Sequence, residues 1–103
     1  PGLLKEAGAE GHAGTAARGS NPACAAVTVL LRTAYEAMAA VPGVTVRGEA
    51  PTPGSLSFRL LHCPADAVAR LRGMSDFLAV GLSGVEREYP GLIELRMIHE
   101  RRN

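Results

Sequence analysis

The sequence predicts an α+β domain in which two amphipathic helices pack on a small mixed or antiparallel β-sheet, giving two layers. Two long segments carry apolar residues at spacings of three and four, which is typical of helices with one buried face. Shorter segments alternate apolar and polar residues, as strands do. A chain of 103 residues rarely divides into two cores, so residues 1–103 are expected to form one domain. Because the chain begins at Pro1 without a methionine, the prediction leaves room for a first strand missing at the N-terminus.

The N-terminal half is expected to contain one strand and the first helix. Residues 3–10 alternate weakly and predict a modest strand. Asn21 is a good N-cap, Pro22 suits the first helical position, and no helix breaker follows before Pro42. The apolar stripe of this helix, which should face the core, consists of Val27, Leu30, Leu31, Ala34, Met38 and Val41.

The C-terminal half is expected to contain three strands and the second helix. Strands are predicted over 44–49 and 56–61, separated by a turn rich in proline and glycine at 50–54. A helix is predicted from Pro64 to about residue 89, and a last strand over 92–99. The apolar stripe of this second helix consists of Val68, Leu71, Met74, Leu78, Leu82 and Val85. The predicted order is therefore strand, helix, strand, strand, helix, strand.

The composition argues against several classes of function. The net charge is only +1 and Lys5 is the sole lysine, so no basic face for direct nucleic-acid binding is expected. Two Tyr and two Phe are too few for a base-stacking platform. No apolar run approaches the length of about 18 residues that a membrane span needs. Without a secretory signal, a cytoplasmic location with Cys24 and Cys63 as reduced thiols is expected.

Cys24 is the residue whose position best suits chemistry, because the predicted helix places it in the first turn. The free backbone N–H groups and the positive end of the helix dipole favour thiolate over thiol there. The same N–H groups can stabilise an oxyanion. A thiolate is a nucleophile for acyl transfer, and an imidazole is its natural proton partner. His12 lies twelve positions upstream. On these grounds alone, a cysteine that only packs and a solvated histidine remain the alternatives.

Residues 11–21 read GHAGTAARGSN and predict a flexible loop between the candidate histidine and cysteine. Such a loop can fold back to bring His12 beside Cys24, and it can close over a peptide as a lid. Gly14 and Gly19 would provide the flexibility. Arg18 and Ser20 would contact a substrate or point into water, and the sequence does not separate those two readings.

Residues 11–28, GHAGTAARGSNPACAAVT, resemble the signature of the Prp family of ribosomal-processing cysteine proteases. The shared pattern is GHAG, a glycine-containing loop, and a cysteine followed by small residues and a hydroxyl residue. Residues 71–98 are also similar to the C-terminal part of the family, so the resemblance covers most of the chain. It implies that Cys24 is the nucleophile and His12 the general base and then acid. It also implies a homodimer without a cofactor.

The activity implied by this resemblance is removal of an N-terminal extension from the bacterial large-subunit ribosomal protein L-twenty-seven, with cleavage after an aromatic residue. The chain departs from the family pattern just before the cysteine, where Asn21-Pro22-Ala23 replaces the usual Asp-Ile-Val. Asn21 keeps hydrogen-bonding capacity without the charge, so a supporting role for it is retained in the prediction. Thr28 replaces the usual serine and keeps its hydroxyl, which suggests a second supporting role.

Two other classes of function remain as alternatives. One is a non-catalytic module that binds a ribosomal protein or takes part in ribosome assembly, suggested by the altered segment before Cys24. The other is a cysteine-dependent hydrolase of small molecules. A metal site is not expected, because the histidines and cysteines lack the close ligand pairs that zinc sites show. These residues are His12, Cys24, His62, Cys63 and His99.

Overall fold

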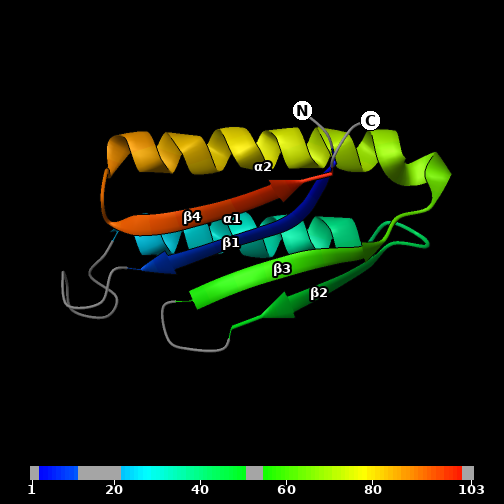
Figure 1. Ribbon diagram of the computed structural model, residues 1–103, viewed down its shortest axis with the longest axis horizontal. Helices are drawn as coiled ribbons and strands as arrows, with labels where there is room; N and C mark the ends of the chain where they lie inside the picture. Colours follow the sequence, from blue (N-terminus) through cyan, green and yellow to red (C-terminus); the bar gives the residue numbers. More distant parts are fainter. Residues whose placement is uncertain (1–2, 12–21, 51–54, 101–103) are drawn as a thin grey trace.

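The computed structural model describes residues 3–11, 22–50 and 55–100, which form a four-stranded sheet and two long helices (Figure 1). The elements follow the predicted order, with a short 3-10 helix, η1, ahead of the second long helix. Their bounds are β1 Leu4–Gly11, α1 Pro22–Ala39, β2 Thr45–Glu49, β3 Ser55–His62, η1 Ala65–Ala67, α2 Val68–Glu88 and β4 Ile93–His99. The predicted α+β class is confirmed.

The sheet is antiparallel throughout rather than mixed. Its strand order is β2-β3-β1-β4, so β1 lies in the interior and β2 and β4 form the edges. In the registers of β1, Ala7 lies opposite Phe58 on one side and Met97 on the other. The weakly alternating segment near the N-terminus is therefore an interior strand of the sheet, because β3 and β4 pair with it on its two sides.

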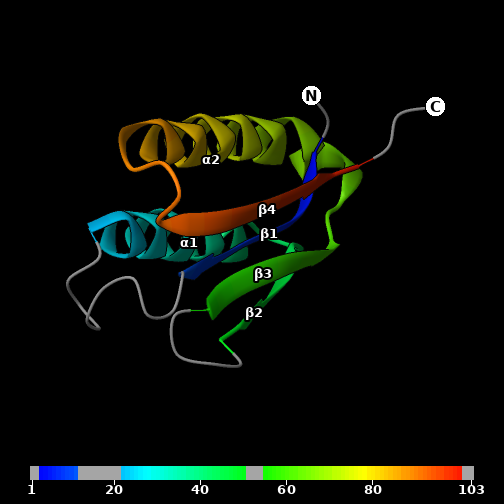
Figure 2. The same cartoon turned by 60° about the vertical axis from the view of Figure 1, so that its left-hand side comes forward.

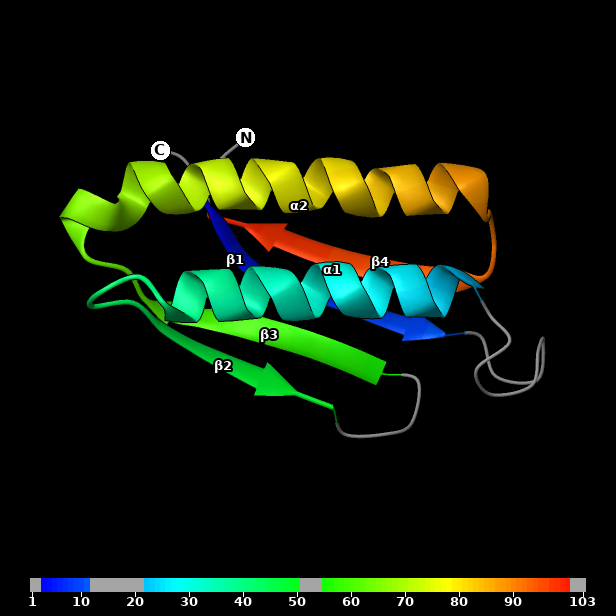
Figure 3. The same cartoon turned by 180° about the vertical axis from the view of Figure 1, so that it is seen from behind.

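Both helices pack on one face of the sheet, side by side and antiparallel (Figure 3). Figure 2 shows this helix layer and the sheet from a second direction. On the other face, the described strands carry no covering helix (Figure 1). Alternation decides which side chains face the helices: Phe58 and Leu60 are buried, whereas Arg59 between them is exposed. The core thus lies between the helix layer and the inner face of the sheet.

The helices bury most residues of the predicted stripes, while Val68 and Met74 of α2 are half-buried. In α1, Val27, Leu31 and Met38 are buried. Leu30 is half-buried, and its methyl groups lie where a side chain on Gly81 of α2 would stand, at 3.2 Å from the position of a Cβ atom. Gly81 therefore allows the two helices to approach closely at this point.

A proline–glycine turn follows each long helix. The turns are closed by hydrogen bonds from the N–H of Val44 to the carbonyl oxygen of Val41 and from the N–H of Leu92 to that of Tyr89, at 3.1 Å and 3.3 Å. Gly43 and Gly91 are the third residues of these turns, and each has φ = 81°, in the left-handed region that favours glycine. The second helix begins later than predicted, because Pro64 is extended with ψ = 152° and η1 precedes Val68. A helical residue needs ψ near −40°, so the chain enters α2 through this 3-10 turn rather than at the proline.

Ser75 is a buried polar residue on the apolar stripe of α2, and a hydrogen bond links it to β1. Its Oγ donates a hydrogen bond to the carbonyl oxygen of Leu71 at 2.8 Å and accepts one from the backbone N–H of Leu4 at 3.1 Å. The N–H of Leu4 lies where the register of β1 with β4 shifts. Ser75 thus satisfies a backbone donor at an irregular point of the sheet.

Candidate active site

Cys24 is the third residue of α1 and is half-buried. Ala23 beside it is completely buried and Val27, one turn later, is 2% exposed, so the start of the helix is held firmly against the core. β1 ends, α1 begins and β3 begins at the same end of the domain (Figure 1, left). The thiol is therefore placed at one end of the domain by a helix whose first turn is packed on the sheet.

The electrostatic setting of Cys24 comes from the helix start. The first backbone N–H groups of a helix have no partner within the helix, and the dipole places partial positive charge there. The first turn of α1 contains no acidic side chain that would oppose a thiolate. The predicted position of Cys24 in the first turn is confirmed, and this position suits a nucleophilic sulfur and an oxyanion.

Thr28 lies one turn after Cys24. Its Oγ1 donates a hydrogen bond of 2.7 Å to the carbonyl oxygen of Cys24. This bond reaches the backbone of the nucleophile residue. Thr28 therefore acts on the helical geometry around Cys24, where threonine hydroxyls commonly bond the carbonyl four residues earlier.

His12, the predicted partner of Cys24, lies outside the described residues, as do Asn21 and the loop residues Gly14, Arg18, Gly19 and Ser20. The roles predicted for these six residues stay predictions. The structure describes the two elements that flank them, β1 and α1. β1 ends at Gly11 and α1 begins at Pro22, and both lie at the same end of the domain (Figure 1).

Cys63 differs from Cys24 in its surroundings. It follows the last residue of β3, at the opposite end of the domain (Figure 1), and its Sγ donates a hydrogen bond of 3.5 Å to the carbonyl oxygen of Pro64. Burial raises the pKa of the Cys63 thiol, and the negative charge of Glu100 raises this pKa further. Lys5 acts in the opposite direction, and Asp66 adds a smaller upward contribution. Cys63 is therefore a poor candidate for a nucleophile.

Within residues 3–11, 22–50 and 55–100, no three His, Cys, Asp or Glu side chains are placed to hold a metal ion. His62 is exposed at the end of β3, while His99 is half-buried at the end of β4. Among the same residues, no helix is long and apolar enough to cross a membrane.

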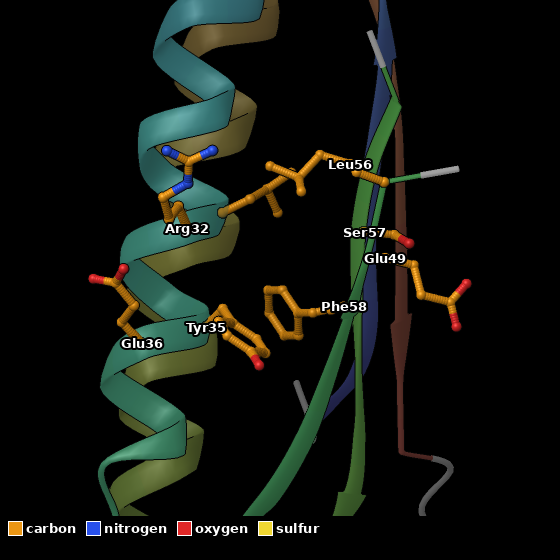
Figure 4. A pocket seen from close by; sticks show the side chains of 10 residues that line it. Arg32, Tyr35, Glu36, Glu49, Leu56, Ser57 and Phe58 are labelled. Carbon is orange, nitrogen blue, oxygen red and sulfur yellow. The ribbon is translucent and has the colours of Figure 1, made fainter. Parts of the chain in front are cut away.

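A pocket of about 380 Å³, which was not predicted from the sequence, lies between α1 and the hairpin of β2 and β3 (Figure 4). We call it the hairpin pocket. Its walls come from both layers, and their apolar part consists of Leu31, Tyr35, Gly48, Ala50, Leu56 and Phe58. The polar residues that also line it are Arg32, Glu36, Glu49 and Ser57. A signal was present in the sequence, because glycine and alanine occupy alternate positions at the end of β2 and leave that side of the pocket without bulky side chains.

Comparison with known proteins defines the class of this protein as a cysteine protease, an enzyme that hydrolyses peptide bonds. The family model described as cysteine protease Prp matches residues 2–94. The chain therefore belongs to the cysteine protease Prp family, as the resemblance of residues 11–28 implied. No curated protein and no solved structure matches the chain.

Proposed function

We propose that this protein is an endopeptidase that removes the N-terminal extension of the bacterial large-subunit ribosomal protein L-twenty-seven, with Cys24 as nucleophile and His12 as general base and acid. The observation that carries the proposal is the position of Cys24 in the first turn of α1, in a chain of the Prp family. The described elements support a pairing of His12 with Cys24. The end of β1, which precedes His12, and the start of α1, which bears Cys24, lie at the same end of the domain (Figure 1).

The proposed chemistry follows the Cys–His pattern of acyl transfer. The imidazole of His12 takes the thiol proton, and the sulfur of Cys24 forms a bond to the carbonyl carbon of the scissile peptide. The N–H groups at the start of α1 stabilise the resulting oxyanion. The C–N bond then breaks as the imidazolium gives its proton to the leaving amine. A water molecule, deprotonated by the same imidazole, hydrolyses the thioester and returns the sulfur to its thiol form.

We further propose that the enzyme acts in the cytoplasm, as a homodimer and without a cofactor. Two cysteines kept as thiols agree with a reducing compartment. Two large apolar side chains on the outer surface of α2, Phe77 and Val80, are 76% and 72% exposed. An exposed apolar pair on one helix is a reasonable surface for a second copy.

The direct test is cleavage of a peptide that spans the junction of the extension in the ribosomal protein of the source organism. The wild type is compared with Cys24→Ala, His12→Ala and the control Cys63→Ala, each checked for folding by circular dichroism. We expect cleavage by the wild type and by Cys63→Ala, and a loss of at least a thousandfold in the other two. Cleavage that survives His12→Ala would refute the dyad. Failure of a folded wild type to cut this peptide would refute the proposed substrate.

A further inference from the structure

We propose that the hairpin pocket is a substrate subsite that binds one bulky apolar side chain of the substrate, three to five residues away from the scissile bond. This inference rests on the proposed role of Cys24 as nucleophile, and it adds a determinant of substrate choice remote from the reacting atoms.

The pocket lies where the edge strand β2 has no large side chain directed toward α1. Every second residue of β2 faces α1, and Val46 is the last of these with a large side chain. Gly48 lies opposite Phe58 of β3 in the sheet register. A Cβ atom on Gly48 would lie 3.4 Å from the ring of Tyr35. The ring of Tyr35 therefore packs against the backbone of β2 at Gly48 and is half-buried, while Phe58 is only 2% exposed, so Tyr35 is the ring that a ligand would reach.

The walls favour an apolar occupant, because Glu36 and Glu49, which also line the pocket, point away from the pair of aromatic rings (Figure 4). Tyr35 and Phe58 form a tilted ring pair with centroids 6.5 Å apart and an angle of 52° between the planes. In Figure 4 these rings point toward one another from α1 and β3, and Leu56 projects toward the helix above them. A volume of about 380 Å³ lies at the small end of ligand pockets, about 300–1,000 Å³. That size suits a single large side chain.

The pocket lies on the same face of α1 as the candidate nucleophile. Residues 24, 28, 31 and 35 are separated by four, three and four positions, so they line one side of the helix. With a rise of about 1.5 Å per residue, Leu31 and Tyr35 lie about 10 Å and about 16 Å along the axis from Cys24. An extended peptide covers about 3.3 Å per residue, so these distances correspond to three to five residues of substrate.

The edge of the sheet offers a way to hold such a peptide. In the described sheet β2 pairs only with β3, so its outer side presents main-chain groups to an added strand. A strand placed there would direct alternate side chains toward α1. Gly48, which lies opposite the inward-facing Phe58, lines the hairpin pocket into which one of them would point. The arrangement would combine main-chain binding along β2 with selection of one apolar side chain.

The test uses the junction peptide with Leu or Ala placed in turn at the third, fourth and fifth positions on each side of the scissile bond. Cleavage is measured for the wild type, for Gly48→Val, which fills the pocket with a residue that strands favour, and for the control Gly73→Ala. A Cβ atom on Gly73 meets no atom within 4 Å.

At one position we expect Leu to give at least a tenfold higher kcat/KM than Ala in the wild type and in Gly73→Ala. In Gly48→Val the ratio of kcat/KM for the Leu peptide to that for the Ala peptide should fall to about twofold or less. Such a fall would show that residue 48 and the substrate side chain are energetically coupled, as groups in contact are. The inference is overturned if the preference persists in Gly48→Val, or if no position shows one.

Binding to Cys24→Ala separates this inference from the proposed function. We expect the Leu peptide, but not the Ala peptide, to shift the NMR signals of the Gly48 amide and the Tyr35 ring. If the wild type cuts no peptide while these shifts occur, the proposed substrate fails and the subsite stands. If the peptides are cut but neither signal moves, the subsite fails and the protease assignment stands.

Discussion

At the scale of single residues, the two thiols of this chain are distinguished by what surrounds them. Cys24 lies at a helix start with no acidic side chain in the first turn, whereas Cys63 lies among groups that disfavour its negative charge. Glu100 and Asp66 repel a thiolate at Cys63, and burial removes part of its hydration. The surroundings of Cys63 thus disfavour its thiolate, whereas the first turn of the helix that bears Cys24 contains no acidic side chain.

This contrast predicts selective alkylation. Because the pKa of Cys63 is raised, its thiolate fraction at a given pH is smaller than that of an ordinary thiol, and its alkylation should accelerate only at higher pH. Below the ordinary thiol pKa of about 8.5, iodoacetamide should therefore modify Cys24 at least tenfold faster than Cys63. Mass spectrometry of Cys63→Ala and Cys24→Ala isolates each thiol in turn. Equal, slow rates would remove the physical basis for an activated nucleophile.

At the scale of elements, β1 and β3 approach closely at Gly8. A Cβ atom there would lie 2.9 Å from the Cβ of Ser57, a distance that real side chains essentially never show. Gly8 and Ser57 are opposite one another in the register, next to the pair Ala7 and Phe58 that is buried beneath the helices, so alternation places them on the uncovered face of the sheet. The glycine is thus required by close approach rather than by its backbone angles.

We therefore expect Gly8→Ala to lower the free energy of unfolding by about 1–3 kcal/mol, since the strands must move apart to admit the methyl group. Urea denaturation measures the change. The matched control is Gly73→Ala in α2, which should be neutral or raise stability by up to about 1 kcal/mol, because alanine favours helix. The double variant Gly8→Ala with Ser57→Gly should recover part of the loss. If Gly8→Ala is as stable as the wild type, the close approach is not a constraint.

At the scale of the whole molecule, exposed apolar surface is divided between the two layers. The outer surface of α2 presents Phe77 and Val80, while the uncovered face of the sheet presents Leu61, which is 51% exposed. Either surface is available to a second copy. The helix surface is favoured because its two exposed apolar side chains lie three positions apart and are therefore neighbours on the surface of one helix.

The proposed dimer therefore predicts different results for two similar substitutions. Phe77→Ser should shift the protein toward monomer and weaken association at least tenfold, because a large aromatic side chain is removed from the interface. Leu61→Ser, an apolar-to-serine change on the other layer, should leave association unchanged. Sedimentation over a range of concentrations measures both. The reverse result would place the interface on the sheet, and a wild type that sediments as a monomer would refute the dimer.

The amino-acid sequence by itself determined the class of fold, the element order, the two buried stripes and the place of Cys24 in a first turn, because these depend on local periodicity and helix-start signals. Only the tertiary structure decided that the sheet is antiparallel, that Ser75 satisfies the Leu4 amide, and that glycine at 48 leaves a pocket beside Tyr35. Each of these depends on which residues distant in sequence lie together. The local sequence shows that a position carries a small or a polar residue, but tertiary packing determines which atoms of distant residues lie opposite it.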